Sequence, residues 1–296
     1  MDRFDTLEAF VRVVESGSFS AAARELRLGQ PALSKAIARL EQRLGVRLLL
    51  RSTRGLSPTE AGHSYYEHAK RVLAEIEEAD VAARGAGAGF QGRLRVAAPI
   101  AFARLVLVPR LPAFLARHPD LSIELAMDDR HVDLVESGAD LAIRIGPLAG
   151  ATLTARKLAE GRRLVVGTPA FFARHGEPAT PRDLASFEAV TSPGGPGGGA
   201  WTFRKDGAEE RVALAGRLTV TAAEGVRAAV LAGIGLAVAS DWLFARELAS
   251  GAVRTVLADW DLGPVDLWAA FPSGRRATAK ARAFADFVAA VLRPPD

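Results

Sequence analysis

The chain has 296 residues, 49% of them hydrophobic, which is enough for two domains with sizeable cores and unlike a disordered segment. The absence of cysteine excludes a disulfide framework and cysteine-ligated zinc or iron–sulfur sites. The net charge of +4 is small, the first ten residues lack the apolar core of a secretion signal, and no apolar run is long enough for a membrane span. We therefore expect a cytoplasmic protein with no membrane partner and no cofactor.

The basic residues are concentrated in one part of the chain. Between Arg24 and Arg54 there are eight basic residues against only Glu25 and Glu41, so this window carries +6. Residues 59–92 carry three basic and six acidic residues, or −3. A basic block in an otherwise balanced chain suggests a polyanion as partner, although a solvated, arginine-rich face would give the same count.

A first helix is predicted from Asp5 to Ser16. Its apolar residues follow the i, i+3, i+4, i+7 spacing of an amphipathic helix. Asp5 and Glu8 resemble a capping box, and Gly17 suits the left-handed residue that ends a helix. The residues expected on its buried face are Leu7, Phe10, Val11 and Val14.

Two more helices follow with a very short connection between them. Ser20 can cap the second helix, while the third begins near Gly29, has Pro31 in its first turn and ends at Gly45. Because only residues 27–29 separate them, the pair reads as a helix-turn-helix that the first helix supports. The residues expected to be buried are Ala22, Ala23, Leu26, Leu33, Ile37, Leu40 and Leu44.

The polar side of the third helix is predicted to bind double-stranded DNA. In a helix-turn-helix the second helix braces the third, whose first side chains reach base edges in the major groove. Gln30 can bind adenine through two hydrogen bonds, while Ser34 and Lys35 can reach bases or phosphates. A three-helix core without DNA-binding activity would show the same apolar spacing.

Residues 47–59 read as an extended pair of strands around a turn at Thr53–Gly55. Arg51 and Arg54 make this pair a basic wing that is well placed for phosphates, which supply affinity rather than sequence choice. Together with the third helix, the candidate DNA-binding residues are Ser20, Gln30, Pro31, Ser34, Lys35, Arg39, Arg51 and Arg54.

A long helix capped by Thr59 comes next. Its apolar positions alternate steps of four and three residues, the heptad pattern of a helix that pairs with a second copy. This predicts a homodimer that aligns two helix-turn-helix units on a palindromic site; the alternative is a helix lying on its own domain. The predicted dimerisation residues are Tyr65, Ala69, Val72, Ile76, Ala79 and Ala83.

Strands and helices alternate beyond the glycine-rich stretch Gly85–Gly92. This rhythm predicts α/β layers with largely parallel sheets. The G-x-G-x-x-G spacing inside the stretch is not a dinucleotide-binding motif, because it follows a helix and precedes a strand. Gly194–Gly199 is read as a mobile loop. The predicted strands are 93–98, 122–127, 140–145, 163–168, 217–221, 235–239 and 265–271.

Catalytic patterns are absent from the sequence. The five histidines do not cluster at metal-ligand spacing, and neither a G-x-S-x-G elbow nor a phosphate-binding Walker loop is found. We therefore expect no enzymatic activity. Two alternatives stay open: a solute-binding protein whose N-terminal helices only pack, and an enzyme on a solute-binding fold.

The stretch "ESGSFSAAARELRLGQPALSKAIARLEQRLGVRLLLRSTRGLSPTEAG" resembles the LysR-type transcriptional regulators. The resemblance continues, in the same order, through "DLAIRIG", "WTFRKDG", "VTAAEGVRAAVLAGIGLAVAS" and "FPSGRRATAKARAFADFV". The chain differs from the family at two positions. Gly29 stands where the family usually has serine or asparagine, and the apolar Leu50 stands where the family often has an acidic or polar residue. The resemblance implies an α/β protein with an all-α N-terminal part, and adds an effector-domain contact that makes a homotetramer.

The domains implied by the resemblance are a winged helix-turn-helix at 1–58, a linker helix and hinge at 59–92, and an effector-binding domain at 93–296. The last resembles a two-lobed periplasmic solute-binding protein. Crossovers are placed near Leu164 and Val265, so lobe one is 93–163 with 266–296 and lobe two is 164–265. The final helix, with Phe284, Phe287, Val288 and Val291 at helical spacing, should pack on lobe one.

A small-molecule effector is expected between the lobes, at strand ends and helix N-termini. Many family members have at Pro99 a serine or threonine that hydrogen-bonds the effector. For Arg144 the alternative is an ion pair with an acid, and for Thr221 a helix cap. Apolar residues beside positive charge predict an organic acid or aromatic metabolite. Asp129 follows the second strand, and the implied effector-binding residues are Ala98, Pro99, Ile100, Phe102, Arg130, His131, Arg144, Gly146 and Thr221.

Overall fold

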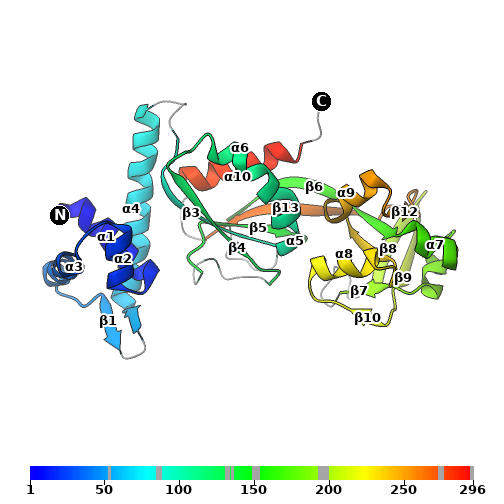
Figure 1. The fold of residues 1–296 in the computed structure, drawn as a ribbon, viewed down its shortest axis with the longest axis horizontal. Helices are drawn as coiled ribbons and strands as arrows, with labels where there is room; N and C mark the ends of the chain where they lie inside the picture. Colours follow the sequence, from blue (N-terminus) through cyan, green and yellow to red (C-terminus); the bar gives the residue numbers. More distant parts are fainter. Residues whose placement is uncertain are drawn as a thin grey trace. The chain divides into compact units, whose positions relative to one another are not determined.

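The computed structural model describes residues 1–52, 55–84, 89–130, 134, 137–148, 154–192, 200–272 and 277–293. It divides the chain into two compact units, one of Met1–Gly89 with Gly274–Ala279 and the other of Phe90–Ser273 with Lys280–Asp296 (Figure 1). The predicted loop at 194–199 lies outside the described residues.

The first unit is a bundle of helices with a small hairpin. Its elements are α1 (Arg3–Ser16), α2 (Phe19–Glu25), α3 (Gln30–Leu44), β1 (Leu49–Ser52), β2 (Gly55–Pro58) and α4 (Glu60–Arg84). β1 and β2 pair antiparallel, which confirms the predicted extended pair; the central turn residues 53 and 54 lie outside the described residues. The core contains the predicted Phe10, Val11, Ala22, Ala23, Leu33, Ile37 and Leu40. Leu44 is 39% exposed, so its predicted burial is wrong: it is the last residue of α3, directly before Gly45 turns the chain away.

The first two helices begin two residues earlier than predicted. α1 begins earlier, because Asp2 and Asp5 form the capping box, with bonds of 2.8 and 2.9 Å to each other's backbone N–H groups. Ser18, not Ser20, caps α2 by accepting from the N–H of Ala21. The predicted ends at Gly17 and Gly45 are confirmed: both glycines adopt the left-handed conformation, with φ of 61° and 70°.

α4 begins where Thr59 accepts the N–H of Gly62 at 2.9 Å, as predicted. A Cβ on Gly62 would stand 1.9 Å from the carbonyl oxygen of Leu48, so only glycine allows this approach of helix to hairpin. The first half of α4 packs on its own unit: Ala69 is 2% exposed, and the ring of Tyr65 meets that of Phe10 edge-on at 5.3 Å. In this half, therefore, the apolar positions of the heptad pattern pack on the helix's own domain, which was the alternative to pairing with a second copy.

The second unit is built around one large sheet. Its order is β11-β6-β13-β5-β3-β4, with β12 also paired to β6. β3 runs parallel to β4 and β5, whereas β13 and β11 run antiparallel to β6, so within this sheet the prediction of largely parallel sheets is correct for the β4-β3-β5 part. The separate pair of Val190–Thr191 and Leu218–Thr219 is also parallel. The strands are β3 (Gly92–Ala98), β4 (Leu121–Met127), β5 (Leu141–Ile145), β6 (Thr154–Gly167), β11 (Ala237–Ser240), β12 (Arg254–Val256) and β13 (Pro264–Phe271).

Two long antiparallel strands join two lobes in this unit. β6 pairs with β13 along Thr154–Arg162 and then with β11 and β12, and the predicted crossover residues Leu164 and Val265 lie on β6 and β13. Each lobe has its own apolar cluster, one around Ala97, Ala142 and Ala270 and one around Phe172, Phe203 and Leu236.

Lobe one carries α5 (Ile100–Phe102), a π-helical turn η1 (Ala103–Leu107), a 3-10 turn η2 (Val108–Arg110), α6 (Leu111–Leu115) and α10 (Ala279–Val291). The ring of Phe114 in α6 lies 5.4 and 5.0 Å from those of Phe284 and Phe287 in α10, which confirms the predicted packing of the last helix (Figure 1). Within the predicted hinge 85–92, Phe90 is buried and its ring lies 4.9 Å from that of His118 at an interplanar angle of 45°. Residues 85–88 lie outside the described residues.

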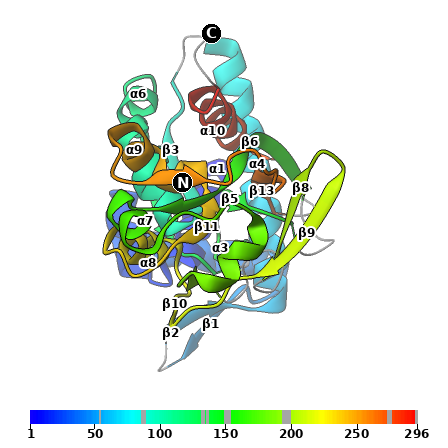
Figure 2. The same ribbon diagram turned by 90° about the vertical axis from the view of Figure 1, so that its right-hand side faces the viewer.

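Lobe two contains the shorter elements, including a hairpin of β8 and β9 that the sequence did not lead us to expect (Figure 2). Its elements are α7 (Pro169–His175), a 3-10 turn η3 (Pro181–Ser186), β7 (Val190–Thr191), β8 (Ala200–Lys205), β9 (Ala208–Ala213), β10 (Leu218–Thr219), α8 (Ala223–Leu231) and α9 (Asp241–Ser250). α8 begins at Ala223 behind Ala222, so Thr221 neither starts nor caps it.

Candidate functional site

The turn between α2 and α3 is held by backbone hydrogen bonds. The N–H of Leu28 donates to the carbonyl of Ala23 at 2.9 Å, and that of Arg27 donates to Arg24 at 3.2 Å. Arg27 has a φ of 54°, the left-handed conformation that lets the chain reverse within three residues. α3 then starts behind Gly29, which offers no side-chain cap. The short connection thus fixes α3 across α2.

The first turn of α3 carries the predicted base-reading residues. The Ser20 hydroxyl of α2 donates to Oε1 of Gln30 at 3.2 Å, so the two helices share a polar contact at their exposed ends. Gln30, Pro31 and Lys35 are exposed, whereas Ser34 is half-buried and already has a partner. The bond to Ser20 orients the Gln30 amide while leaving its NH₂ group free to donate.

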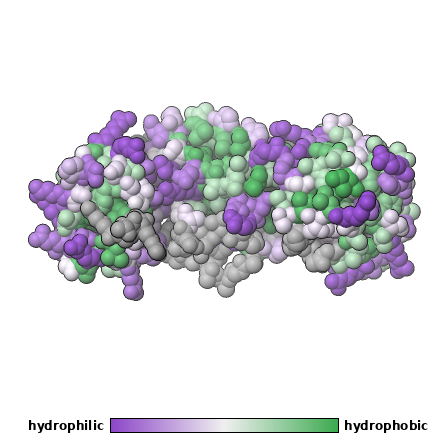
Figure 3. Space-filling model, turned by 60° about the horizontal axis from the view of Figure 1, so that its bottom comes forward, coloured by the Kyte–Doolittle hydropathy of each residue, from purple (hydrophilic) through white to green (hydrophobic). Residues whose placement is uncertain are grey.

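A basic groove runs beside α3. It has a volume of about 450 Å³, and its walls come from α3 and the start of α1. Lys35, Arg39 and Arg43 stand one turn apart along it, and Arg3 faces them. Hydrophilic and hydrophobic side chains are both present on the face of this unit that Figure 3 shows. Arg3 and Arg43 were not among the predicted DNA-binding residues. The position of Arg43, four residues after Arg39 and so on the same side of α3, was a usable signal for it.

The wing is attached to α3 through Glu41. The N–H groups of Leu48 and Leu49 both donate to Oε1 of Glu41, at 2.8 and 3.0 Å, and the carboxylate is only 14% exposed. Sequence analysis treated Glu41 only as a charge opposing the basic block. Arg51 lies on β1, but its side chain, like residue Arg54, is outside what the structure describes.

The exposed part of the linker helix is shorter than the predicted seam. Val72 is 43% exposed, Ile76 is half-buried and Ala79 is exposed, whereas Tyr65 and Ala69 pack against their own core. The side chain of Ala83 is not among those described. Of the predicted seam residues whose side chains are described, Val72, Ile76 and Ala79 are therefore the ones that a second chain could cover.

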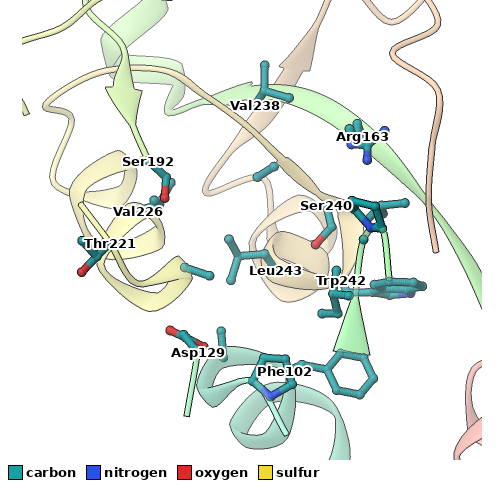
Figure 4. A pocket seen from close by; sticks show the side chains of 18 of the residues that line it. Phe102, Asp129, Arg163, Ser192, Thr221, Val226, Val238, Ser240, Trp242 and Leu243 are labelled. Carbon is teal, nitrogen blue, oxygen red and sulfur yellow. The ribbon is translucent and has the colours of Figure 1, made fainter. Parts of the chain in front are cut away.

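The second unit contains a cavity of about 430 Å³ (Figure 4). Its walls come from both lobes: α5 and β5 of lobe one, α8, β11 and α9 of lobe two, and the two crossing strands. The lining includes Pro99, Phe102, Asp129, Gly146, Arg163, Ser192, Trp201, Thr221, Val226, Val238, Ser240, Trp242, Leu243 and Val265. This size is typical of sites for small organic molecules.

The predicted effector-binding residues divide between this cavity and other places. Those that line it are Pro99, Phe102, Gly146 and Thr221. Ala98, Ile100 and Arg144 do not line it. Ala98 is buried in the sheet, the N–H of Ile100 donates to Asp129, and Arg144 is half-buried on β5. His131 lies outside the described residues.

Arg130 does not reach the cavity. Its side chain is 88% exposed and binds the carboxylate of Asp128 at 2.8 Å. This bond lowers the pKa of Asp128 and raises that of Arg130. The predicted positive charge of the site is supplied instead by Arg163 on β6.

Arg163 is the basic residue among the described cavity-lining residues. Its Nη1 donates to the carbonyls of Leu262 and Gly263 at 3.4 and 3.3 Å, and its guanidinium lies 5.8 Å from the centre of the Trp201 ring. Burial lowers its pKa, although a guanidinium stays charged throughout the physiological range. Sequence reasoning missed Arg163; the signal was a cation at the start of an apolar strand, "RLVV".

Asp129 stands at another part of the cavity wall. Its Oδ1 accepts the N–H of Ile100 at 2.9 Å and so fixes the start of α5. Its Oδ2 is buried and has no hydrogen-bond partner. Aromatic side chains fill the wall near it, since Phe102 meets Trp242 edge-on at 5.9 Å.

An ion-pair network joins the two lobes beside the cavity. Arg104 of η1 binds Glu224 of α8, which also accepts from Arg227 at 3.4 Å, and Arg227 binds Glu247 of α9. α8 thus presents Val226 to the cavity and Glu224 to lobe one.

The described residues contain no group of three or more histidine, aspartate or glutamate side chains that could hold a metal ion. Within the same residues, no helix is both long and apolar enough to cross a membrane.

Comparisons with known proteins match both units. Residues 4–63 match the bacterial regulatory helix-turn-helix protein of the lysR family, and residues 87–293 match the LysR substrate binding domain. A transcriptional regulator of the helix-turn-helix type from Xanthomonas campestris pv. campestris is 37% identical over 97% of this chain and 84% of its own. The regulator CrgA from Neisseria meningitidis serogroup C is 33% identical over 96% of this chain and 95% of its own.

Solved structures of LysR-type regulators also match this chain. The structure of CrgA, a LysR-type regulator from Neisseria meningitidis, matches with a TM-score of 0.62 and 31% identity over 98% of this chain and 99% of the other. The virulence activator AphB of Vibrio cholerae matches with a TM-score of 0.58 and 28% identity over 97% and 98%. These relatives are regulators of transcription and not enzymes. The chain belongs to the LysR-type transcriptional regulators.

Proposed function

We propose that this regulator binds a split, roughly palindromic promoter site on double-stranded DNA in the cytoplasm, and that a small organic acid or aromatic metabolite controls it. The observation that carries the proposal is the pairing, in one chain, of a basic helix-turn-helix with a cavity between two lobes. The domain division that fits it is 1–58, 59–92 and 93–296.

DNA contacts fall into two groups. Gln30 and Lys35, exposed on the first two turns of α3, reach base edges, with Ser34 beside them. Arg39 of the groove and Arg51 of the wing bind phosphates, joined by Arg43 and Arg3. Losing a base contact should relax sequence preference at one position, whereas losing a phosphate contact weakens all sequences alike.

Dimerisation proceeds through the second half of α4, from Val72 onward. Val72, Ile76 and Ala79 leave apolar surface at heptad spacing, which a second copy of α4 can cover. A further contact between effector domains makes a homotetramer. Two aligned helix-turn-helix units then meet two half-sites on one face of the DNA.

DNA binding is controlled through the arrangement of the two lobes of the effector-binding domain. A ligand in the cavity favours one lobe arrangement over another by its difference in affinity, about 1–3 kcal/mol in typical cases. The change passes to the paired linker helices and alters the spacing of the DNA-binding units, and with it the bend in the DNA.

Footprinting of the intergenic region beside the gene, with and without a metabolite library, tests this proposal. We expect protection of two half-sites by the wild type and a changed pattern with a library member that also stabilises the protein against heat. Protection that ignores sequence, or a pattern that no stabilising compound alters, contradicts it.

A further inference from the structure

The cavity carries opposite charges at separate places. Among the described residues that line it, Arg163 is the basic one and Asp129 the acidic one. In Figure 4, Arg163 lies at the upper right and Asp129 at the lower left, with the other labelled side chains between and around them. A ligand that fills the space can therefore touch both.

Arg163 has hydrogen-bond donors to spare. A guanidinium has five, and only Nη1 is engaged, by two carbonyl oxygens at 3.3 Å or more. No carboxylate forms an ion pair with Arg163 in the described part of the chain, and Asp266, whose charge acts on it, is paired with Lys157 at 2.6 Å. The Ser240 side chain adds a hydroxyl, because the register places Ser240 opposite Arg163 on the neighbouring strand. This end of the cavity suits an anion.

Asp129 suits a hydrogen-bond donor rather than an anion. Its Oδ1 is held by the Ile100 N–H, so the carboxylate cannot turn away without breaking that bond. The buried Oδ2, with no partner, is an unsatisfied acceptor, which is costly unless a donor reaches it. A ligand hydroxyl or amino group would satisfy it.

The wall between these groups is mainly apolar and aromatic. Phe102, Trp201 and Trp242 contribute rings, and Val226 and Leu243 lie beside them. Such a wall suits a flat apolar body, whose faces and edges pack on the rings.

Resting on the proposed effector role of this cavity, we propose that its ligand is an aromatic acid with a hydrogen-bond donor at the end away from the carboxylate. The carboxylate binds Arg163 and Ser240, the ring packs among Trp201, Trp242 and Phe102, and the donor binds Oδ2 of Asp129.

Calorimetry on the full chain with four matched compounds tests this assignment. Para-hydroxyphenylacetate has both groups, para-methoxyphenylacetate and phenylacetate lack the donor, and para-hydroxyphenylacetamide lacks the charge. The hydroxy acid should bind at least about tenfold more tightly than each of the others. The methoxy and unsubstituted acids lose the hydrogen bond to the Asp129 carboxylate, and the amide loses the negative charge that strengthens its hydrogen bond to Arg163.

Two variants separate the contacts. Asp129→Asn keeps an oxygen for the Ile100 N–H and turns the free acceptor into a donor, so the preference for the hydroxy acid over the methoxy acid should vanish or reverse. Arg163→Gln should abolish the preference for the acid over the amide. Two controls should bind like the wild type: Asp128→Asn, which alters the acid paired with Arg130, and Arg162→Gln, the exposed neighbour on β6.

The outcomes distinguish this assignment from the proposed function. If the hydroxy acid binds no better than phenylacetate, or if Asp129→Asn weakens all four compounds alike, the ligand class is wrong. If the four fail but other library metabolites stabilise the protein and alter the footprint, the ligand class falls and the proposed function stands. If no metabolite of any class stabilises the protein, the proposed function falls as well.

Discussion

Replacing Glu41 with alanine should release the wing from α3. The Glu41 carboxylate lies 14% exposed between the helix and the hairpin, and one of its oxygens accepts the N–H groups of both Leu48 and Leu49. In the alanine variant both N–H groups lose their acceptor, so the first strand of the hairpin is no longer tied to α3 through this side chain.

The magnitude follows from the number and kind of bonds. A hydrogen bond to a charged group contributes about 1.5–3 kcal/mol, and because the two bonds share one oxygen they do not add fully, so we expect a local loss of about 2–3 kcal/mol. Glu41→Gln keeps the oxygen but not the charge, and neutral bonds are roughly half as strong, which gives a loss of about 1 kcal/mol.

Hydrogen exchange read by mass spectrometry measures this loss. Protection of the Leu48 and Leu49 amides should fall about thirtyfold in Glu41→Ala and about fivefold in Glu41→Gln, while α1 keeps its protection. DNA affinity should fall in the same order, because the wing carries Arg51, which we propose binds a phosphate. Equal losses in the two variants, or losses spread over α1, would refute the assignment.

Three further predictions concern the first unit. Gly62→Ala would bring a Cβ to 1.9 Å from the Leu48 carbonyl, so urea denaturation should show a loss of about 1–3 kcal/mol. Burial raises the pKa of Tyr66 above its usual 10.0, so the unfolded chain loses this proton at a lower pH than the folded protein does. The stability linked to Tyr66 is therefore complete below pH 10 and falls as the pH rises through the raised pKa. Tyr66→Phe should lessen this alkaline loss of stability in a series of denaturation curves. Replacing Val72 and Ile76 with glutamate should give monomers by light scattering with much weaker DNA binding, and a monomer that still bound DNA tightly would sink the dimer proposal.

Local patterns in the sequence were enough to predict the helix-turn-helix, the wing and the last helix. Apolar spacing and short connections determine these elements within a few residues, as Gly17 and Gly45 illustrate. The N-caps were misplaced because Asp2 and Ser18 compete with nearby polar residues, and only the backbone geometry decides among them.

The cavity was harder to predict, since its walls depend on contacts between distant strands. The family resemblance indicated Pro99, Phe102, Gly146 and Thr221, and these four residues line the cavity. The positive charge was assigned to Arg130, His131 and Arg144, but Arg130 points to solvent, Arg144 does not line the cavity and His131 lies outside the described residues. Arg163 enters from a crossing strand, and the cation before its apolar run does not by itself show that the side chain faces a cavity.

The dependence of DNA affinity on salt tests the central claim most directly. Neutralising a phosphate contributes about 0.9 to the slope of log affinity against log salt concentration. We predict a steep negative slope for the full-length protein, a slope shallower by about 1.8 for the Arg39→Gln, Arg43→Gln double variant, and no change for Arg162→Gln. A double variant with the wild-type slope would show that the α3 groove does not bind DNA and would contradict the account.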